Sequence, residues 1–246
     1  MRKFPFAAAA ALALILSAPA RAQDDEGRFE VGGQFTVANL SNGRGSTVTS
    51  VPCNAPCTPT TQTSFSNERG TEPGVGARFG YGVNRHLTLE AEANFFPRDR
   101  DEFDPDFTGG RKVQALFGVK AGQRYESAGV FAKARAGFVH FGRGNLRPRQ
   151  GVACILVVPP PLGCYEGTGR TDFAVDLGGV FELYPSKKTI VRFDVGDTIL
   201  RAGDHLVPVI VNPPSGTSFP ARAVVAGAPA ETTHNLQASV GLGFRF

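Results

Sequence analysis

The chain has 246 residues, of which 41% are hydrophobic and 20% charged, and its formal net charge is +4. This composition excludes an intrinsically disordered protein, a collagen and a coiled coil. The 20 phenylalanines and 30 glycines, with a single methionine, favour strands over a helical bundle, because aromatic side chains suit a pleated surface. Beyond the N-terminus no apolar run is long enough for a membrane helix, but a transmembrane barrel carries its apolar residues at alternate positions.

The N-terminus has the pattern of a secretory signal peptide. Two basic residues precede an apolar stretch up to Leu16, and Ala20-Arg21-Ala22 supplies the small residues that signal peptidase recognises. We predict a signal peptide over residues 1–22, cleaved before Gln23, and one mature domain over residues 23–246; an uncleaved membrane anchor is the alternative. The mature part has 23 basic residues against 22 acidic ones, so no nucleic-acid partner is implied.

The mature chain alternates apolar and polar residues with period two, which is the pattern of half-buried strands. The eight predicted strands are residues 29–37, 75–83, 87–95, 112–121, 130–138, 172–183, 191–196 and 235–246. They average around ten residues, which is what a tilted strand needs to cross a bilayer.

The connections between these strands alternate strictly between short and long. The short ones are residues 84–86, 123–129 and 185–188, and the long ones are residues 40–71, 97–110, 142–170 and 198–233. The long segments are rich in Gly, Pro, Ser, Thr and charge and are predicted to be loops. An up-and-down meander with one short rim and one long rim is typical of outer-membrane barrels.

Four cysteines lie in two of the long segments. Cys53 and Cys57 share one segment, and Cys154 and Cys164 share another. In an exported protein this arrangement favours two local disulfides, one within each pair. A zinc site is the alternative, and it is disfavoured because the pairs lie far apart in sequence and no histidine has the usual ligand spacing. Each disulfide closes a short loop and would therefore stiffen that loop more than it stabilises the fold.

Alternation alone does not say which face of the barrel points inward. A soluble, lipocalin-like barrel would enclose the Phe, Val and Leu face, whereas a membrane barrel places that face against lipid. The polar face is rich in small residues, which fit a narrow lumen, and its charges nearly balance, which suits buried ion pairs. The predicted lumen ion-pair network comprises Arg78, Glu90, Glu92, Lys112, Lys120, Lys133, Arg135, Asp176, Glu182, Arg192, Asp194 and Arg245, with Glu30 on the same face.

The last strand ends in a pattern with a known counterpart. Ser239, Gly241, Phe244 and Phe246 resemble the C-terminal β-signal of bacterial outer-membrane proteins. With the signal peptide and eight strands, the mature chain resembles the OmpA-like outer-membrane β-barrel family along nearly its whole length. The resemblance implies an all-β fold, an eight-stranded antiparallel up-and-down transmembrane β-barrel in the outer membrane. It also implies outer-membrane lipid and, transiently, the outer-membrane assembly machinery as partners. No residues remain for a peptidoglycan-binding domain, so wall anchoring is not implied.

The sequence contains few candidates for catalysis. Some outer-membrane barrels act on lipid A, and the lipid A deacylase family carries a His-x-Ser pair with an acidic partner. The nearest counterpart here, His140-Phe141-Gly142, lacks the hydroxyl, so no nucleophile is expected there. The other histidines, His86, His205 and His234, lie in or beside predicted connections and are interpreted as solvated polar residues.

Two acidic features have simpler interpretations than catalysis or metal binding. Glu90 and Glu92 share the polar face of one strand and are interpreted as ion-pair partners rather than as an acid and a base. The carboxylates of residues 98–106 could bind Ca²⁺, but they lack the EF-hand spacing and are typical of a solvated loop. We therefore predict no catalytic residue, no cofactor and no metal site.

The expected function is structural or adhesive, in a monomeric barrel whose long extracellular loops bind a ligand, because eight strands enclose only enough room for side chains. A narrow OmpW-like pore for small solutes is the alternative. It needs an apolar channel in the outer half of the lumen, and Leu116, Phe131 and Val180 are the inward-facing apolar residues available. A lipid-modifying enzyme and a soluble periplasmic barrel are less favoured, the latter because of the terminal Phe246.

Overall fold

The computed structural model describes residues 28–41, 45–51, 60–65, 69–99, 109–151, 164–212 and 222–246. The predicted signal peptide lies outside these residues and stays a prediction. Within the described part, no helix is long and apolar enough to cross a membrane.

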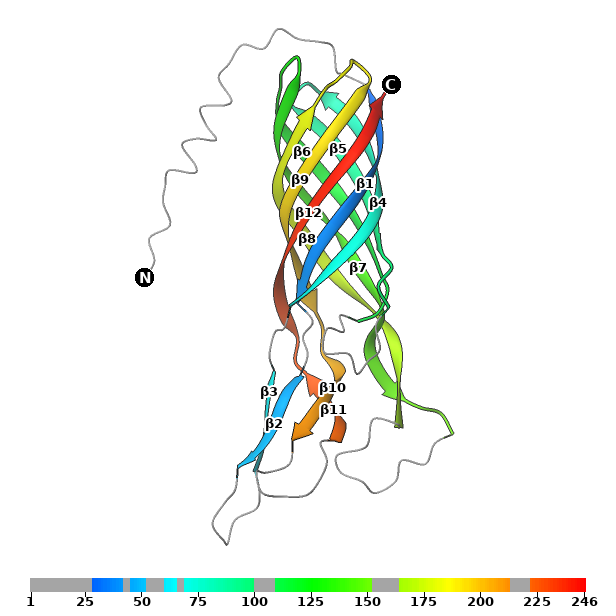
Figure 1. Cartoon of the computed structure of the whole chain (residues 1–246), viewed down its shortest axis with the longest axis vertical. Coiled ribbons are helices and arrows are strands. Elements are labelled where there is room, and N and C mark those ends of the chain that lie inside the picture. The colour runs from blue at the N-terminus through cyan, green and yellow to red at the C-terminus, as the bar shows by residue number, and fades with distance from the viewer. Residues whose placement is uncertain are drawn as a thin grey trace, which may run out of the picture.

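Eight strands close into a barrel in the order β1-β12-β9-β8-β7-β6-β5-β4 (Figure 1). They are β1 (Phe29–Ser41), β4 (Arg69–Asn84), β5 (Leu87–Phe96), β6 (Lys112–Arg124), β7 (Ala128–Pro148), β8 (Tyr165–Leu183), β9 (Thr189–Ala202) and β12 (Glu231–Arg245). Every neighbouring pair is antiparallel, including β1 with β12, which closes the barrel. The predicted eight-stranded antiparallel barrel is confirmed.

The strands are longer than the ten or so residues that the sequence pattern predicts, and range from 10 residues in β5 to 21 in β7. The excess lies mainly at one end of the barrel, which we call the loop end because the long connections leave from it. At the opposite end, the turn end, the strands are joined by short turns at Arg85–His86, Tyr125–Ser127 and Tyr184–Lys188. The predicted alternation of short and long connections is therefore confirmed.

The polar face of the barrel points inward and the apolar face outward. Leu236, Leu242 and Phe117 are 58, 61 and 60% exposed on the outer surface, whereas Lys120 and Glu182 are fully buried. Because successive side chains of a strand point to opposite faces, this holds along every barrel strand. The outer surface is thus apolar, as a lipid-facing surface must be.

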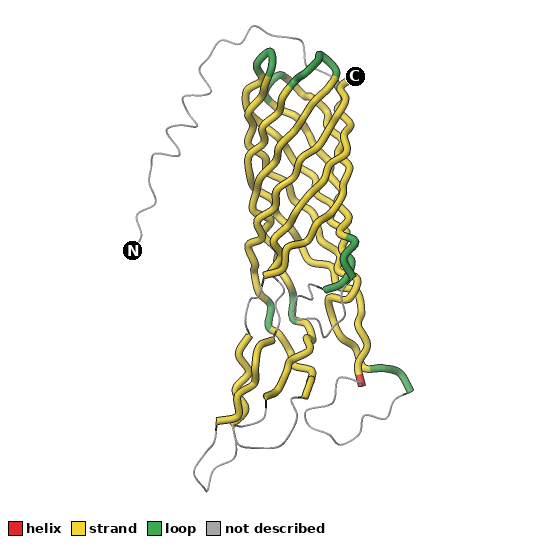
Figure 2. Tube along the Cα trace, in the orientation of Figure 1, coloured by secondary structure: helices red, strands yellow, loops and turns green. Residues whose placement is uncertain are grey.

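A second sheet lies beyond the loop end of the barrel (Figures 1 and 2). Its strands are β2 (Gly45–Val51), β3 (Thr60–Phe65), β10 (His205–Asn212) and β11 (Arg222–Ala228), in the order β11-β10-β2-β3, with β10 parallel to β2. The prediction that residues 40–71 and 198–233 are loops was wrong for these stretches. Their Gly, Pro and Thr content is typical of loops, but each segment forms short strands, and strands of the two segments pair with one another.

The lumen as candidate functional site

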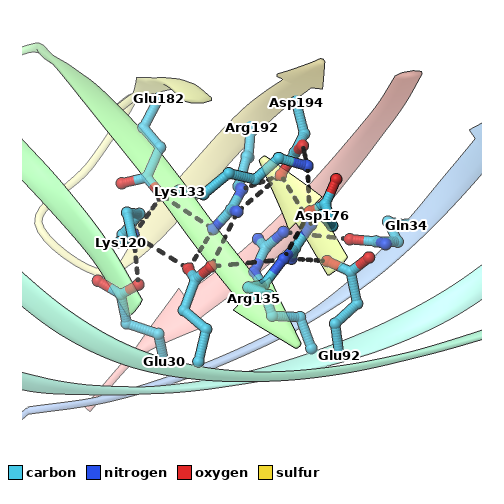
Figure 3. Close-up of polar contacts among 12 residues, drawn as sticks. Glu30, Gln34, Glu92, Lys120, Lys133, Arg135, Asp176, Glu182, Arg192 and Asp194 are labelled. Atoms are coloured by element: carbon cyan, nitrogen blue, oxygen red, sulfur yellow. Dashed lines mark hydrogen bonds and ion pairs between the residues drawn. The ribbon is translucent and has the colours of Figure 1, made fainter. Parts of the chain in front are cut away.

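A network of charged side chains lies in the lumen, on the parts of the strands nearer the turn end. Figure 3 shows the contacts among its members. All eight barrel strands contribute to it: Glu30 from β1, Arg78 from β4, Glu90 and Glu92 from β5, Lys120 from β6, Lys133 and Arg135 from β7, Asp176 and Glu182 from β8, Arg192 and Asp194 from β9, and Arg245 from β12. Each of these residues is at most 7% exposed. The inward positions predicted from period two are thus the positions that the structure places in the lumen.

Arg135 lies at the centre of one cluster of this network. Its guanidinium donates to Asp176 Oδ2 through Nε at 2.9 Å and Nη2 at 2.6 Å, and to Glu92 Oε2 through Nη1. Lys133 Nζ lies 2.9 Å from the same Asp176 oxygen and also contacts Asp194. These contacts join β5, β7, β8 and β9 across the lumen (Figure 3).

A second cluster surrounds Glu90. Arg192 donates to both Glu90 oxygens, through Nη2 at 3.1 Å and through Nη1, and its Nη2 also donates to Asp194 Oδ2 at 2.7 Å. Lys120 Nζ lies 2.6 Å from Glu182 Oε1 and 3.5 Å from Glu90 Oε1. Arg192 thereby links the two clusters, because Asp194 belongs to both.

The network ends at the turn end, where Arg124 and Tyr184 join it although the sequence pattern did not assign them to it. Glu30 accepts from Arg245 at 2.8 Å and from Arg124 at 3.0 Å. Arg124 Nε also donates to the hydroxyl of Tyr184, which donates to Glu182 at 2.9 Å. Burial, and then the negative charge of Glu182, raise the pKa of Tyr184, so this hydroxyl stays protonated and can donate.

Charge balance allows the network to exist inside the barrel. The six carboxylates are those of Glu30, Glu90, Glu92, Asp176, Glu182 and Asp194, and the seven cations are Arg78, Lys120, Arg124, Lys133, Arg135, Arg192 and Arg245. An unpaired charge in such a place would cost several kcal/mol, on the order of 3–5. A filled, paired lumen of this kind holds the strands in register and leaves little room for solute.

A layer of uncharged polar side chains follows toward the loop end. Gln34 donates to Asn94 at 2.8 Å, Asn94 to Gln114 at 2.8 Å and Gln114 to Gln237 at 3.1 Å, and Thr198 also donates to Gln237 at 3.1 Å. This chain of amides spans the lumen from β1 through β5 and β6 to β12 and β9. The sequence pattern places the four amide residues on the polar face of predicted strands, but it places Thr198 in the predicted connection 198–233. The contacts between these residues depend on the strand register, which cannot be read from the sequence.

An apolar cluster fills the loop-end part of the lumen. It comprises Ala38, Leu40, Phe96, Leu116, Val139, Phe141, Ala174 and Leu200. Of the three residues considered for an apolar pore, only Leu116 belongs to it. Phe131 and Val180 are cross-strand partners nearer the turn end, where Lys120 Nζ lies 4.7 Å from the Phe131 ring centre.

Lys112 lies in this outer part, apart from the charged network with which it was grouped. Its Nζ is 3.5 Å from Glu72 Oε1 and donates to the carbonyl of Gly110 at 2.9 Å, and both side chains are at most 1% exposed. Glu72 was missed because Pro73 and Gly74 interrupt the alternation, so the strand was predicted to begin at Val75.

The start of β10 lies against the loop end of the barrel, where the Leu206 N–H donates to Asn145 Oδ1 at 2.9 Å. His205 is 7% exposed, and its Nδ1 lies 2.8 Å from the carbonyl of Gly203. Burial, and then the neighbouring Arg170, lower the pKa of His205. Arg170 in turn stacks over Phe141, 5.2 Å from its ring centre. The prediction that His205 is a solvated residue was therefore wrong.

The other histidines lie on the outside of the barrel. His86 is exposed in a turn, and His234 Nδ1 is 2.6 Å from Asp197 Oδ2. His140 Nδ1 is 2.9 Å from the hydroxyl of Thr171 on the adjacent strand. The triplet His140-Phe141-Gly142 itself contains no hydroxyl, and this partner comes from the adjacent strand β8. Among the described residues, no carboxylate hydrogen-bonds to this histidine.

The predicted C-terminal motif lies where the barrel closes. Phe244 and Phe246 are 57 and 74% exposed, and the Phe246 N–H donates to the Phe29 carbonyl at 2.9 Å, beside the β1–β12 pairing. Ser239 and Gly241 lie on the inward face of β12. The motif therefore presents its aromatic residues to the outer surface and its small residues to the lumen.

The predicted disulfides fall mostly outside the part of the chain that the structure describes. Cys164 immediately precedes β8, whereas Cys53, Cys57 and Cys154 lie outside the described residues. Neither the pairing of Cys53 with Cys57 nor that of Cys154 with Cys164 is therefore tested, and both disulfides stay predictions. The described part contains no group of three or more residues placed to hold a metal.

The comparisons with known proteins agree with this architecture. The family model described as "Outer membrane protein beta-barrel domain" matches residues 8–246. The chain therefore belongs to this family of bacterial outer-membrane proteins, in which short turns face the periplasm and long loops the exterior. No curated protein matches the chain.

Solved structures that resemble the chain include three bacterial surface barrels. Neisserial surface protein A has 11% identity and a TM-score of 0.47, covering 90% of this chain and 100% of that one. OprG of Pseudomonas aeruginosa has 12% identity and a TM-score of 0.45, with coverages of 90% and 97%. The attachment invasion locus protein Ail of Yersinia pestis has 11% identity and a TM-score of 0.41, with coverages of 90% and 99%.

Proposed function

We propose that this outer-membrane barrel is a closed, non-enzymatic scaffold that binds at the cell surface through its extracellular segments. The observation that carries the proposal is the lumen filling: buried charged, amide and apolar side chains occupy the lumen from the turn end to the loop end. An eight-stranded barrel filled in this way has no path for free diffusion of solutes. Its function then resides outside the lumen.

The loop end supplies the surface on which binding would occur. The β7–β8 hairpin and the second sheet extend beyond the barrel (Figure 1). The hairpin is paired as far as Pro148 and Tyr165, and Arg147 forms an ion pair with Glu166 at 2.7 Å within it. Extended segments on a rigid scaffold are where binding residues usually lie.

The proposal is tested by trimming the extracellular segments while keeping the barrel. Residues 42–68 and 144–168 would each be replaced by a short Asn-Gly turn. Bacteria displaying the full chain or the trimmed chain would be compared for attachment to epithelial cell layers and to collagen-coated plates. We expect attachment by the full chain and its loss on trimming, with both proteins folded in the outer membrane. Equal attachment by both would contradict the proposal.

A narrow pore is the second candidate, and the apolar cluster favours it. Phe96, Val139 and Leu200 line the outer half of the lumen, which is the place where a path for apolar solutes would begin. If this function is correct, Val139→Asp slows uptake of a small apolar solute such as toluene by intact cells. The scaffold proposal predicts uptake equal to that of cells lacking the protein.

A further inference from the structure

One buried cation of the lumen has no ion-pair partner. The charged network holds seven cations against six carboxylates, and Arg78 of β4, which is 7% exposed, accounts for the surplus. Arg78 Nη1 donates to the amide oxygen of Gln34 at 3.2 Å. Among the residues that the structure describes, no carboxylate lies within ion-pair distance of this guanidinium. Buried charges are normally paired with an opposite charge, and an arginine has five N–H groups to donate.

The carboxylates that attract Arg78 are bound by other cations. There are three of them: Glu90 is bound by Arg192, Glu92 by Arg135 and Glu182 by Lys120. Arg192 also repels Arg78 electrostatically, so the two guanidinium groups act on the same part of the lumen. Like charges in a buried place are costly unless an anion offsets them. The protein's own carboxylates therefore offset the charge of Arg78 only in part.

The barrel wall between Arg78 and Arg192 carries almost no side chains on its inner face. Arg78 of β4 pairs with Gly32 of β1, and Gly32 pairs with Gly243 of β12. The next inward row toward the loop end runs Gln34, Gly241 and Arg192 across β1, β12 and β9. Directly opposed residues of neighbouring strands point to the same face. Between the two arginines, the lumen is thus lined by three glycines and Gln34, and we call this surface the glycine wall.

We propose that Arg78 binds a small inorganic anion of the size of chloride against the glycine wall. The N–H groups that Gln34 does not occupy would donate to the ion, and Arg192 would attract it through its charge. One such anion brings the negative charges to seven and makes the network neutral. The filled lumen limits the size of the ion, because a larger anion would have to displace paired side chains. The inference is independent of the proposed surface-binding function, since one enclosed ion leaves the lumen closed.

The proposal is tested by unfolding the full chain with urea, in non-ionic detergent, in mixtures of sodium chloride and sodium gluconate at constant ionic strength. The protein is unfolded and refolded in each mixture, so that an anion enclosed during folding is exchanged. Gluconate has the charge of chloride but is too large for the glycine wall. A ligand that binds only the folded state stabilises it by mass action. The ratio of folded to unfolded protein should therefore rise by up to about tenfold for each tenfold increase in chloride.

Two variants alter the site in different ways. Arg78→Gln should abolish the chloride dependence and still fold, because it removes the surplus charge itself. Gly243→Ala keeps the charge, and the added methyl group would lie 3.3 Å from its nearest neighbour, a backbone oxygen. This methyl group occupies part of the site, so we expect the stabilisation to need higher chloride concentrations. The matched control is Arg111→Gln, which removes an exposed arginine paired with Asp99 and should keep the full dependence.

Bromide locates the ion directly. Crystals of the wild-type protein grown in sodium bromide should give an anomalous peak beside Arg78, and crystals of Arg78→Gln should not. Three results would overturn the proposal. One is equal stability of the wild-type protein in chloride and in gluconate. Another is a chloride dependence in Arg78→Gln as strong as that of the wild-type protein. The third is bromide found only beside exposed basic residues, which would indicate an adventitious ion only.

Discussion

Replacing Arg135 by methionine removes the cation that joins β7 to β5 and β8 inside the lumen. Methionine keeps an apolar stem of similar length but leaves Glu92 without its ion-pair partner, because Arg135 is the one cation paired with Glu92 among the described residues. Breaking a buried ion pair costs about 3–5 kcal/mol. Asp176 keeps Lys133 at 2.9 Å, so we expect the lower end, about 3 kcal/mol of lost unfolding free energy.

The assay is urea unfolding of the folded protein in detergent, followed by far-UV circular dichroism and by the fraction that migrates as the folded band in unboiled samples. Tryptophan fluorescence is not an option because the chain has no tryptophan. Adding Glu92→Gln to Arg135→Met should restore about 1–2 kcal/mol, since the unpaired charge is removed. Arg111→Met is the control, because that exposed pair contributes less than about 1 kcal/mol. If Arg135→Met is no more costly than the control, the reasoning is refuted.

Three further predictions concern other parts of the chain. In Gly178→Val, a Cβ would lie 2.1 Å from a β9 backbone oxygen and 2.8 Å from Lys133 Cε, so we expect a loss of at least about 1–3 kcal/mol or failure to fold, measured by the heat-dependent band shift. Burial and Arg170 lower the pKa of His205. The neutral side chain therefore contributes its full stability at neutral pH, and this contribution is lost as the pH falls below the ordinary pKa of histidine. The protection of β10 amides, corrected for the intrinsic exchange rate at each pH, should therefore fall on acidification, and His205→Leu should abolish that fall. N-terminal sequencing of the protein from outer membranes should begin at Gln23.

The barrel and its facing could be predicted from the sequence because a membrane-spanning strand meets only two environments, lipid and lumen. Each outward position must be apolar and each inward position can be polar, so period two persists over whole strands such as β12. The prediction failed where that constraint ends. Beyond the membrane, both faces of β7 and β8 meet water or other loops, so the sequence pattern predicts loop where these strands extend to Pro148 and Tyr165.

The contacts between lumen side chains were less predictable than the set of residues that face the lumen. Arg135 and Asp176 could be assigned to the inward face from parity alone, but their pairing depends on register between strands. The same limit explains why the hydroxyl beside His140 was missed: Thr171 lies on the next strand, 31 residues further along the chain. Arg124 was missed for a different reason, because it falls in a segment predicted to be a turn.

The division of the lumen into three layers bears directly on function. Charged pairs near the turn end, amides in the middle and the apolar cluster near the loop end are all buried within the barrel. A solute that entered would have to replace ion pairs at one level and apolar contacts at another. No single solute chemistry suits both environments, which favours a closed scaffold over a conduit.

Conductance of the purified full chain in planar lipid bilayers tests the closed lumen most directly. The account predicts a stable baseline with no discrete channel openings in molar salt, while an added trimeric porin in the same chamber gives clear steps. Reproducible openings of defined size by the folded, wild-type protein would contradict it. Such openings would mean that the network around Arg135 and Glu90 parts to admit ions, and the pore would become the leading function.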